Sequence, residues 1–175
     1  MDELFPLVDE QGNLIGKATR SECHNGTFWL HPVVHLHVLN SSGQLFLQKR
    51  AMNKDTQPGK WDTSVGGHVS YGETIEQALQ REVFEEIGIS AYKPIAVQRY
   101  VWQSSVEKEL VNTFYTIYDG VFEINQEEID SARFWTIDEI QQQIGQGLFT
   151  PNFEYDFNLL LLKLRKQGND EPILF

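Results

Sequence analysis

Apolar and polar residues alternate through the first part of the chain with the two-residue period of half-buried strands. In residues 31–39, for example, Val34 and Leu36 fall on one face, whereas His35 and His37 fall on the other. The pattern predicts a pair of short strands within 4–19, strands over 31–39 and 44–49, and an extended segment over 61–69. The turn sequence Asn-Ser-Ser-Gly between the third and fourth strands predicts a hairpin.

The period changes to that of an amphipathic helix in residues 74–88. Thr74 is placed to cap the start of this helix, with Gln77 three residues on in the capping-box relation. Gly88 is placed to end it as a C-terminal cap. Further strands are predicted over 94–103, 110–119 and 131–136, and further helices from Thr136 or Asp138 to Gln143 and over 151–166.

Strands, one helix, more strands and then terminal helices predict an α+β fold, with a mixed sheet between helices as an α/β/α sandwich. The 175 residues, of which 41% are hydrophobic and 22% charged, suit one globular domain with a substantial core. We therefore expect a single domain over 1–175.

Charge and cysteine content restrict the function classes. The formal net charge of −11 disfavours binding to a nucleic-acid polymer or to an anionic membrane surface. Cys23 is the one cysteine in the sequence, which excludes an intramolecular disulfide and favours a reducing compartment. The first residues resemble no signal peptide, and no apolar run reaches the length of a membrane span. We expect a cytoplasmic protein.

Three glutamates give the central helix a chemical role. Glu82, Glu85 and Glu86 stand at i, i+3 and i+4, and they share one face. A solvated acidic face would lie opposite the apolar stripe, but this cluster continues the stripe. Carboxylates converging there repel one another unless a cation neutralises them, and hard divalent cations prefer oxygen ligands. The sequence therefore predicts a site for Mg²⁺ or Mn²⁺, with an orienting ion pair between Arg81 and Glu73.

The segment before the helix contains two adjacent glycines, Gly66 and Gly67. Glycine lets the backbone approach a ligand closely, and a backbone carbonyl near Gly66 can join the metal shell. Together with the helix, the segment matches the Nudix box without a gap, at Gly67, Glu73, Arg81, Glu82, Val83, Glu85, Glu86, Gly88 and Ile89. Seven fixed identities would coincide by chance about once in 10⁸ starting points.

The chain thus resembles the Nudix family, and the resemblance implies a mixed sheet between helices, with the box as a loop-helix-loop. It also implies divalent-metal-dependent hydrolysis of a diphosphate linkage in a small molecule. Either Glu82 or Glu109 can serve as the general base, and Arg81 orients the carboxylates.

The order of elements also resembles one Nudix-fold branch, the type 1 isopentenyl-diphosphate isomerases, from about Leu7 to Leu164. The segment from Trp61 to His68 is similar to that branch's Trp-Thr-Asn-Ser-Val-Cys-Gly-His. The resemblance implies a second metal, held by His24, His31, His68, Glu107 and Glu109. Such a mixed ligand set suits Zn²⁺ or Mn²⁺. The resemblance also implies diphosphate contacts from Arg20, Arg50 and Lys54, and a Mg²⁺ contact from Glu86.

Two departures separate this chain from the isomerases. Gly66 stands where the branch has a cysteine that transfers protons to and from carbon, and Pro151 is followed by Asn152 where the branch has a tryptophan. The hydrolytic carboxylates of the box are complete. We therefore predict a diphosphate hydrolase on an isomerase-like frame. The alternatives are an isomerase with another proton carrier, and a non-catalytic domain that senses a nucleotide or diphosphate metabolite.

Overall fold

The computed structural model describes residues 2–54 and 56–168. Its centre is a mixed sheet with the strand order β5-β4-β3-β8-β7, in which β6 also pairs with β3 and β9 with β4. β3 and β8 run parallel, and the other pairs run antiparallel. These strands are β3 (Leu30–Leu39), β4 (Leu45–Arg50), β5 (Trp61–Asp62), β6 (Val65–His68), β7 (Ile95–Gln103), β8 (Lys108–Ile117) and β9 (Ile129–Trp135).

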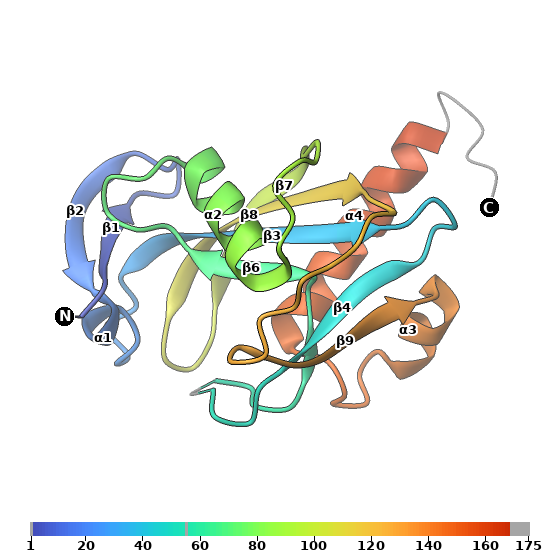
Figure 1. The fold of residues 1–175 in the computed structure, drawn as a ribbon. Coiled ribbons are helices and arrows are strands. Elements are labelled where there is room, and N and C mark those ends of the chain that lie inside the picture. The colour runs from blue at the N-terminus through green and yellow to red at the C-terminus, as the bar shows by residue number, and fades with distance from the viewer. Residues whose placement is uncertain (1, 55, 169–175) are drawn as a thin grey trace.

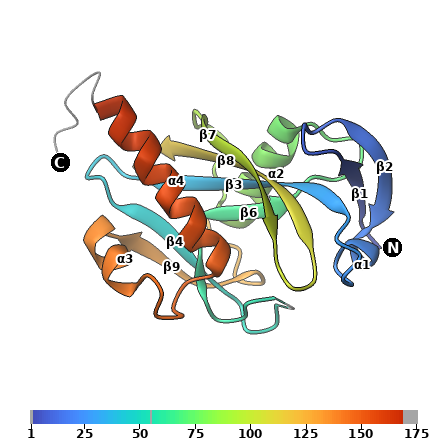
Figure 2. The same cartoon turned by 180° about the vertical axis from the view of Figure 1, so that it is seen from behind.

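Two helices cover the two faces of the sheet, as Figures 1 and 2 show from opposite sides. α2 (Ile75–Ile87) packs on Val34, Leu36 and Val38 of β3, whereas α4 (Pro151–Gly168) packs on the opposite face. The predicted α/β/α sandwich is therefore confirmed. None of the described helices is long and apolar enough to cross a membrane.

The remaining elements lie at the edges of this sandwich. An antiparallel ribbon of β1 (Leu4–Val8) and β2 (Leu14–Thr19) stands at one end of the sheet, beside the start of β3. α1 (Arg20–Cys23) follows the ribbon, and α3 (Ile137–Gln143) follows β9. The ribbon is the pair of strands that the pattern predicted.

The caps of α2 are those that the sequence predicted. The Thr74 side chain accepts a hydrogen bond from the backbone of Gln77, and the Gln77 side chain accepts one from the backbone of Thr74. Gly88 has a φ of 72°, and a Cβ there would lie 2.6 Å from the Cβ of Glu123. Glycine is therefore required at this position for both conformation and space.

Two local predictions were incomplete. No element was predicted between residues 19 and 31, but this segment begins with α1, whose capping box joins Thr19 and Glu22. Four helical residues are too few to show a helical period. The hairpin of β3 and β4 keeps only the pairs Val38–Phe46 and Leu39–Leu45, because β6 pairs with β3 from Val33 to Leu36.

A buried carboxylate on α4 joins that helix to the sheet. Asp156 is fully buried, and its Oδ2 lies 2.8 Å from Nδ1 of His35 and 3.4 Å from Nε2 of His37. Thr113 donates to the same oxygen at 3.2 Å. Burial alone would raise the pKa of Asp156, but the hydrogen bonds and charges of both histidines outweigh it and hold this pKa well below its usual range. The histidines predicted as strand residues thus anchor α4.

We expect Asp156→Ala to lower the free energy of unfolding by about 3–5 kcal/mol, because it removes the acceptor of buried His35 and the carboxylate nearest to buried His37. Chemical denaturation monitored by circular dichroism measures the loss. Lys166→Ala, at an exposed position of the same helix, is the control. Equal midpoints for the two variants would contradict the anchoring role.

Candidate active site

Two carboxyl groups of α2, those of Glu82 and Glu86, contact the backbone of Gly66 and Gly67 on β6. The Glu82 side chain is 14% exposed, and its carboxyl group fills the space that a Cβ at Gly67 would occupy. Glu86 is 6% exposed, and it accepts hydrogen bonds from Gln48 Nε2 at 2.9 Å and from the backbone N–H of Gly66 at 3.3 Å. Glycine at position 67 therefore lets the strand backbone contact the carboxyl group of Glu82, while the backbone N–H of Gly66 binds that of Glu86.

Burial changes the acidity of both groups. Burial raises the pKa of Glu86 to about 8, and the negative charges of Glu82 and Glu128 add to the effect. Burial also raises the pKa of Glu82 to about 7, although the Arg81 charge opposes it. Two neighbouring buried carboxyl groups ionise unfavourably on their own, but a divalent cation neutralises their charges and takes their oxygens as ligands. The residues present therefore fit the metal that the box implies.

The third predicted carboxylate takes a different position. The Glu85 side chain is 55% exposed, and its Oε2 lies 3.2 Å from Nη1 of Arg81. The same guanidinium nitrogen lies 2.8 Å from Glu82 Oε1. Glu85 is therefore not buried beside Glu82 and Glu86. Arg81 instead links its exposed carboxylate to the carboxylate of Glu82.

Arg81 itself is held from the other side. Its Nε and Nη2 donate to the two carboxylate oxygens of Glu73 at 2.7 and 2.9 Å, and Nη2 also donates to the backbone carbonyl of His68 at 3.0 Å. A two-point contact fixes the plane of the guanidinium group. The predicted Arg81–Glu73 pair is therefore present, and it ties the loop before α2 to the carboxylates.

A second cluster is built from the predicted histidines. The ligand atoms of His24, His31, His68 and Glu107 all lie within 4.8 Å of one another. His24 Nε2 is 3.1 Å from His68 Nε2 and 3.2 Å from Glu107 Oε2. Glu109, the remaining predicted ligand, has its Oε1 4.0 Å from His68 Nε2. The four close residues come from four separate parts of the chain: the segment after α1, the start of β3, the end of β6, and the residue before β8.

The donors of this cluster also fit a metal. His31 Nδ1 lies 2.9 Å from the carbonyl of Trp29, whereas its buried Nε2 has no hydrogen-bond partner among the described residues. An imidazole held through one nitrogen presents the other as a ligand. Burial lowers the pKa of both His31 and His68, which favours the neutral form that binds metals. Phe5 stacks on His68 with ring centroids 4.4 Å apart and closes one side.

The two clusters lie on opposite sides of β6. Side chains alternate along a strand, so positions 66 and 68 face one way and position 67 the other. A Cβ at Gly66 would lie 3.4 Å from His35, which faces α4, whereas Gly67 faces Glu82 on α2. The backbone of Gly66 and Gly67 therefore separates the Glu82–Glu86 pair from the histidine cluster.

The predicted diphosphate-binding cations are all close to these clusters, and each has a partner. Arg50 Nη1 is 3.2 Å from Asp62 Oδ2, and Lys54 Nζ is 2.8 Å from Glu128 Oε2. Arg20 Nη1 is 3.2 Å from His68 Nδ1. A phosphate that binds Arg50 or Lys54 competes with a carboxylate already in place.

The sequence assigned no role in the site to three of its polar residues. Gln48 donates to Glu86, and the charge of Glu128 contributes to the raised pKa of both Glu82 and Glu86. Asn152, at the start of α4, accepts a hydrogen bond from Tyr100 at 2.8 Å and lies 3.5 Å from Glu109. These contacts join segments far apart in the chain, so no local spacing indicates them.

Comparison with known proteins agrees with this geometry. The sequence model of the NUDIX domain matches residues 29–153. An isopentenyl-diphosphate Delta-isomerase of Serratia proteamaculans is 35% identical over 153 residues, which cover 86% of this chain and 84% of that protein. A protein of Listeria monocytogenes, described as an uncharacterized Nudix hydrolase, is 32% identical over 154 residues, which cover 86% of this chain and 90% of that protein.

Solved structures show the same fold. The crystal structure of DR0079 from Deinococcus radiodurans superposes with a TM-score of 0.73 at 26% identity, over 85% of this chain and 92% of that one. A MutT protein from Methanosarcina mazei superposes with a TM-score of 0.67 at 21% identity, over 79% of this chain and 95% of that one. The sequence box, the α/β/α sandwich and these matches together show that the chain belongs to the Nudix family.

Proposed function

We propose that the protein is a divalent-metal-dependent hydrolase that cleaves the diphosphate linkage of a small organic molecule, such as a nucleoside diphosphate joined to another group. The observation that carries the proposal is the burial of Glu82 and Glu86 side by side against Gly66 and Gly67. Such a pair provides negative charge where a diphosphate-bound cation needs it.

The residues of this site have distinct roles in the proposed reaction. Mg²⁺ or Mn²⁺ held by Glu82, Glu85 and Glu86 would supply charge neutralisation at phosphate and a more acidic bound water. Arg81 keeps the carboxylates of Glu82 and Glu85 oriented, because it bonds both while Glu73 fixes its plane.

Three carboxylates are candidates for the general base. Burial raises the pKa of Glu82 to about 7. Burial, together with the negative charge of Glu107, also raises the pKa of Glu109 to about 7. A base with a pKa near the working pH transfers protons most efficiently. Glu128 lies outside the box and acts electrostatically on Glu82 and Glu86, so it is the third candidate.

The histidine cluster supports a second metal in the proposal. His24, His31, His68 and Glu107 would hold Zn²⁺ or Mn²⁺, with Glu109 beside them. This cluster also favours the second candidate function, isopentenyl-diphosphate isomerisation, as does the name of the Serratia proteamaculans relative. Gly66 supplies no thiol for that reaction, and we therefore prefer hydrolysis. The intact box likewise disfavours a non-catalytic sensor.

Hydrolysis is tested by incubating the protein with Mg²⁺ or Mn²⁺ and a panel of nucleoside, sugar, coenzyme and isoprenoid diphosphates in ¹⁸O-labelled water. We expect one class to release a labelled monophosphate. Glu86→Gln should lower kcat by about a hundredfold or more, because it removes a charge at the metal site. Glu76→Gln, exposed on the same helix, is the matched control. Conversion of isopentenyl diphosphate without label uptake would contradict hydrolysis, and tight binding without turnover would favour the sensor.

Gly67→Ala should abolish most of the activity while the protein stays folded, because the new Cβ displaces the Glu82 carboxyl group. Gly16→Ala is the control, since a Cβ there meets only Leu7 at 3.7 Å. Steady-state kinetics and circular dichroism on both variants check this. Full activity in Gly67→Ala would show that the position of Glu82 against the strand is irrelevant.

The pH dependence of stability reports on the buried pair. Without metal, the folded protein keeps the protons of Glu86 up to about pH 8 and of Glu82 up to about pH 7, whereas the unfolded chain loses both near the ordinary glutamate pKa of 4.5. The folded state binds more protons in this interval, so the pair lowers stability as pH rises, by up to about 1.4 kcal/mol per pH unit for each group.

We therefore expect Mg²⁺ to raise the unfolding temperature of chelator-treated protein more at about pH 8 than at about pH 5.5. Glu86→Gln should reduce this difference, because it removes one of the two titrating groups. Differential scanning fluorimetry measures both proteins. The same metal effect at both pH values would contradict the assignment of this pair to the metal.

A further inference from the structure

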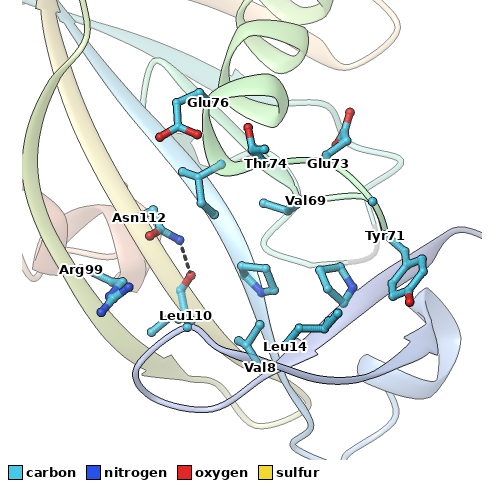
Figure 3. Close-up of a pocket in the computed structure, with 15 residues that line it drawn as sticks. Val8, Leu14, Val69, Tyr71, Glu73, Thr74, Glu76, Arg99, Leu110 and Asn112 are labelled. Atoms are coloured by element: carbon cyan, nitrogen blue, oxygen red, sulfur yellow. Dashed lines mark hydrogen bonds between the residues drawn. The ribbon is translucent and has the colours of Figure 1, made fainter.

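A cavity lies away from the carboxylates, between the β1–β2 ribbon, the start of α2, and strands β7 and β8 (Figure 3). Its volume of about 520 Å³ is in the range of small-molecule sites. Val8 and Leu14 come from the ribbon, Ile75 from α2, and Leu110 from β8, so much of the lining is aliphatic. Neither metal cluster contributes a ligand atom to it.

The fold keeps this cavity separate from Glu82. β6 and β8 pair with opposite edges of β3, and Gly67, which contacts Glu82, is on β6. The cavity lies over β8 and β7, at Leu110, Asn112 and Arg99. A ligand in the cavity therefore occupies the other side of α2 from the carboxylates.

Asn112 indicates what the cavity binds. It is 9% exposed, and its Nδ2 donates to the carbonyls of Val33 at 3.2 Å and Leu110 at 3.1 Å. These two bonds fix the orientation of the amide, and its Oδ1 accepts no hydrogen bond from any described residue. Figure 3 shows this side chain on the cavity wall. Because Oδ1 is accessible from the cavity, it is available to accept a hydrogen bond from an N–H or O–H group of a ligand.

Two opposite charges share the wall with Asn112. Arg99 from β7 and Glu76 from α2 both line the cavity, both are exposed, and neither forms an ion pair within the described part of the chain. Arg99 lies against the ribbon turn, where a Cβ at Gly12 would be 2.9 Å from its Nη1. Glu73 is also present, but Arg81 neutralises it. The wall thus offers one free cation, one free carboxylate and one neutral acceptor.

We propose that this cavity binds a free α-amino acid with an aliphatic side chain. Its carboxylate pairs with the planar fork of Arg99, and its ammonium group donates to Asn112 Oδ1 and to Glu76. Its side chain packs on Val8 and Leu110. A zwitterion matches the paired charges, whereas a phosphate group would face Glu76 without a second cation. A nucleobase is less favoured, because Tyr71 is the one aromatic side chain among the lining residues and the rest of the apolar lining is aliphatic.

Isothermal titration calorimetry of the full chain tests the proposal without any diphosphate substrate, so its result does not depend on hydrolysis. The probes are leucine, leucine amide, which lacks the carboxylate, isocaproate, which lacks the ammonium group, and AMP. We expect leucine to bind and the two analogues to bind at least about tenfold more weakly. Equal binding of isocaproate and leucine, tighter binding of AMP, or no heat with any probe would overturn the proposal.

Variants place the binding at the cavity. Arg99→Met and Glu76→Gln should each weaken leucine binding by about tenfold or more, since each removes one charged partner. Both positions are exposed, so the fold is retained, and circular dichroism verifies this. Arg165→Met, exposed on α4, is the control and should bind leucine as the parent does. Unchanged affinity in Arg99→Met would show that leucine binds elsewhere.

Discussion

The close approach of α2 to the β6 backbone is the constraint on which the candidate site depends. Glu82 has its position because Gly67 leaves room for its carboxyl group, and Glu86 accepts a hydrogen bond from the backbone N–H of Gly66. The protein tolerates this desolvated charge through Arg81 on one side and the amide donors on the other. Their raised pKa values express the unfavourable free energy of ionising both groups there, which a divalent cation offsets.

The same short strand also organises the opposite face. His68 follows the glycine pair and belongs to the histidine cluster, while its backbone carbonyl accepts a hydrogen bond from Arg81. One four-residue strand thus contacts both clusters, and β3 supports it along one edge. The loss of a side chain at Gly66 leaves His35, held by Asp156, facing this strand. Position 66 therefore offers no side-chain group for chemistry at the centre of this frame.

Local signals predicted the parts of the molecule that local interactions determine. The α2 helix was predictable with both caps, because Thr74, Gln77 and Gly88 act within a few residues of the helix ends. The pairing of β6 with β3 was not predictable from local signals. Neither was the Gln48–Glu86 contact, which joins positions 38 residues apart. Long-range pairing also brings Asp156 to His35, 121 residues away. The resemblance to known families predicted the histidine cluster, which spacing alone does not indicate.

The most direct test of the metal assignment is a crystal structure with Mn²⁺ and a non-hydrolysable diphosphate analogue, using anomalous scattering to locate the metal. The account predicts an anomalous peak within bonding distance of the carboxylates of Glu82 and Glu86, with the analogue bound to it. A peak confined to His24, His31, His68 and Glu107, with Glu82 and Glu86 free of metal, would contradict it.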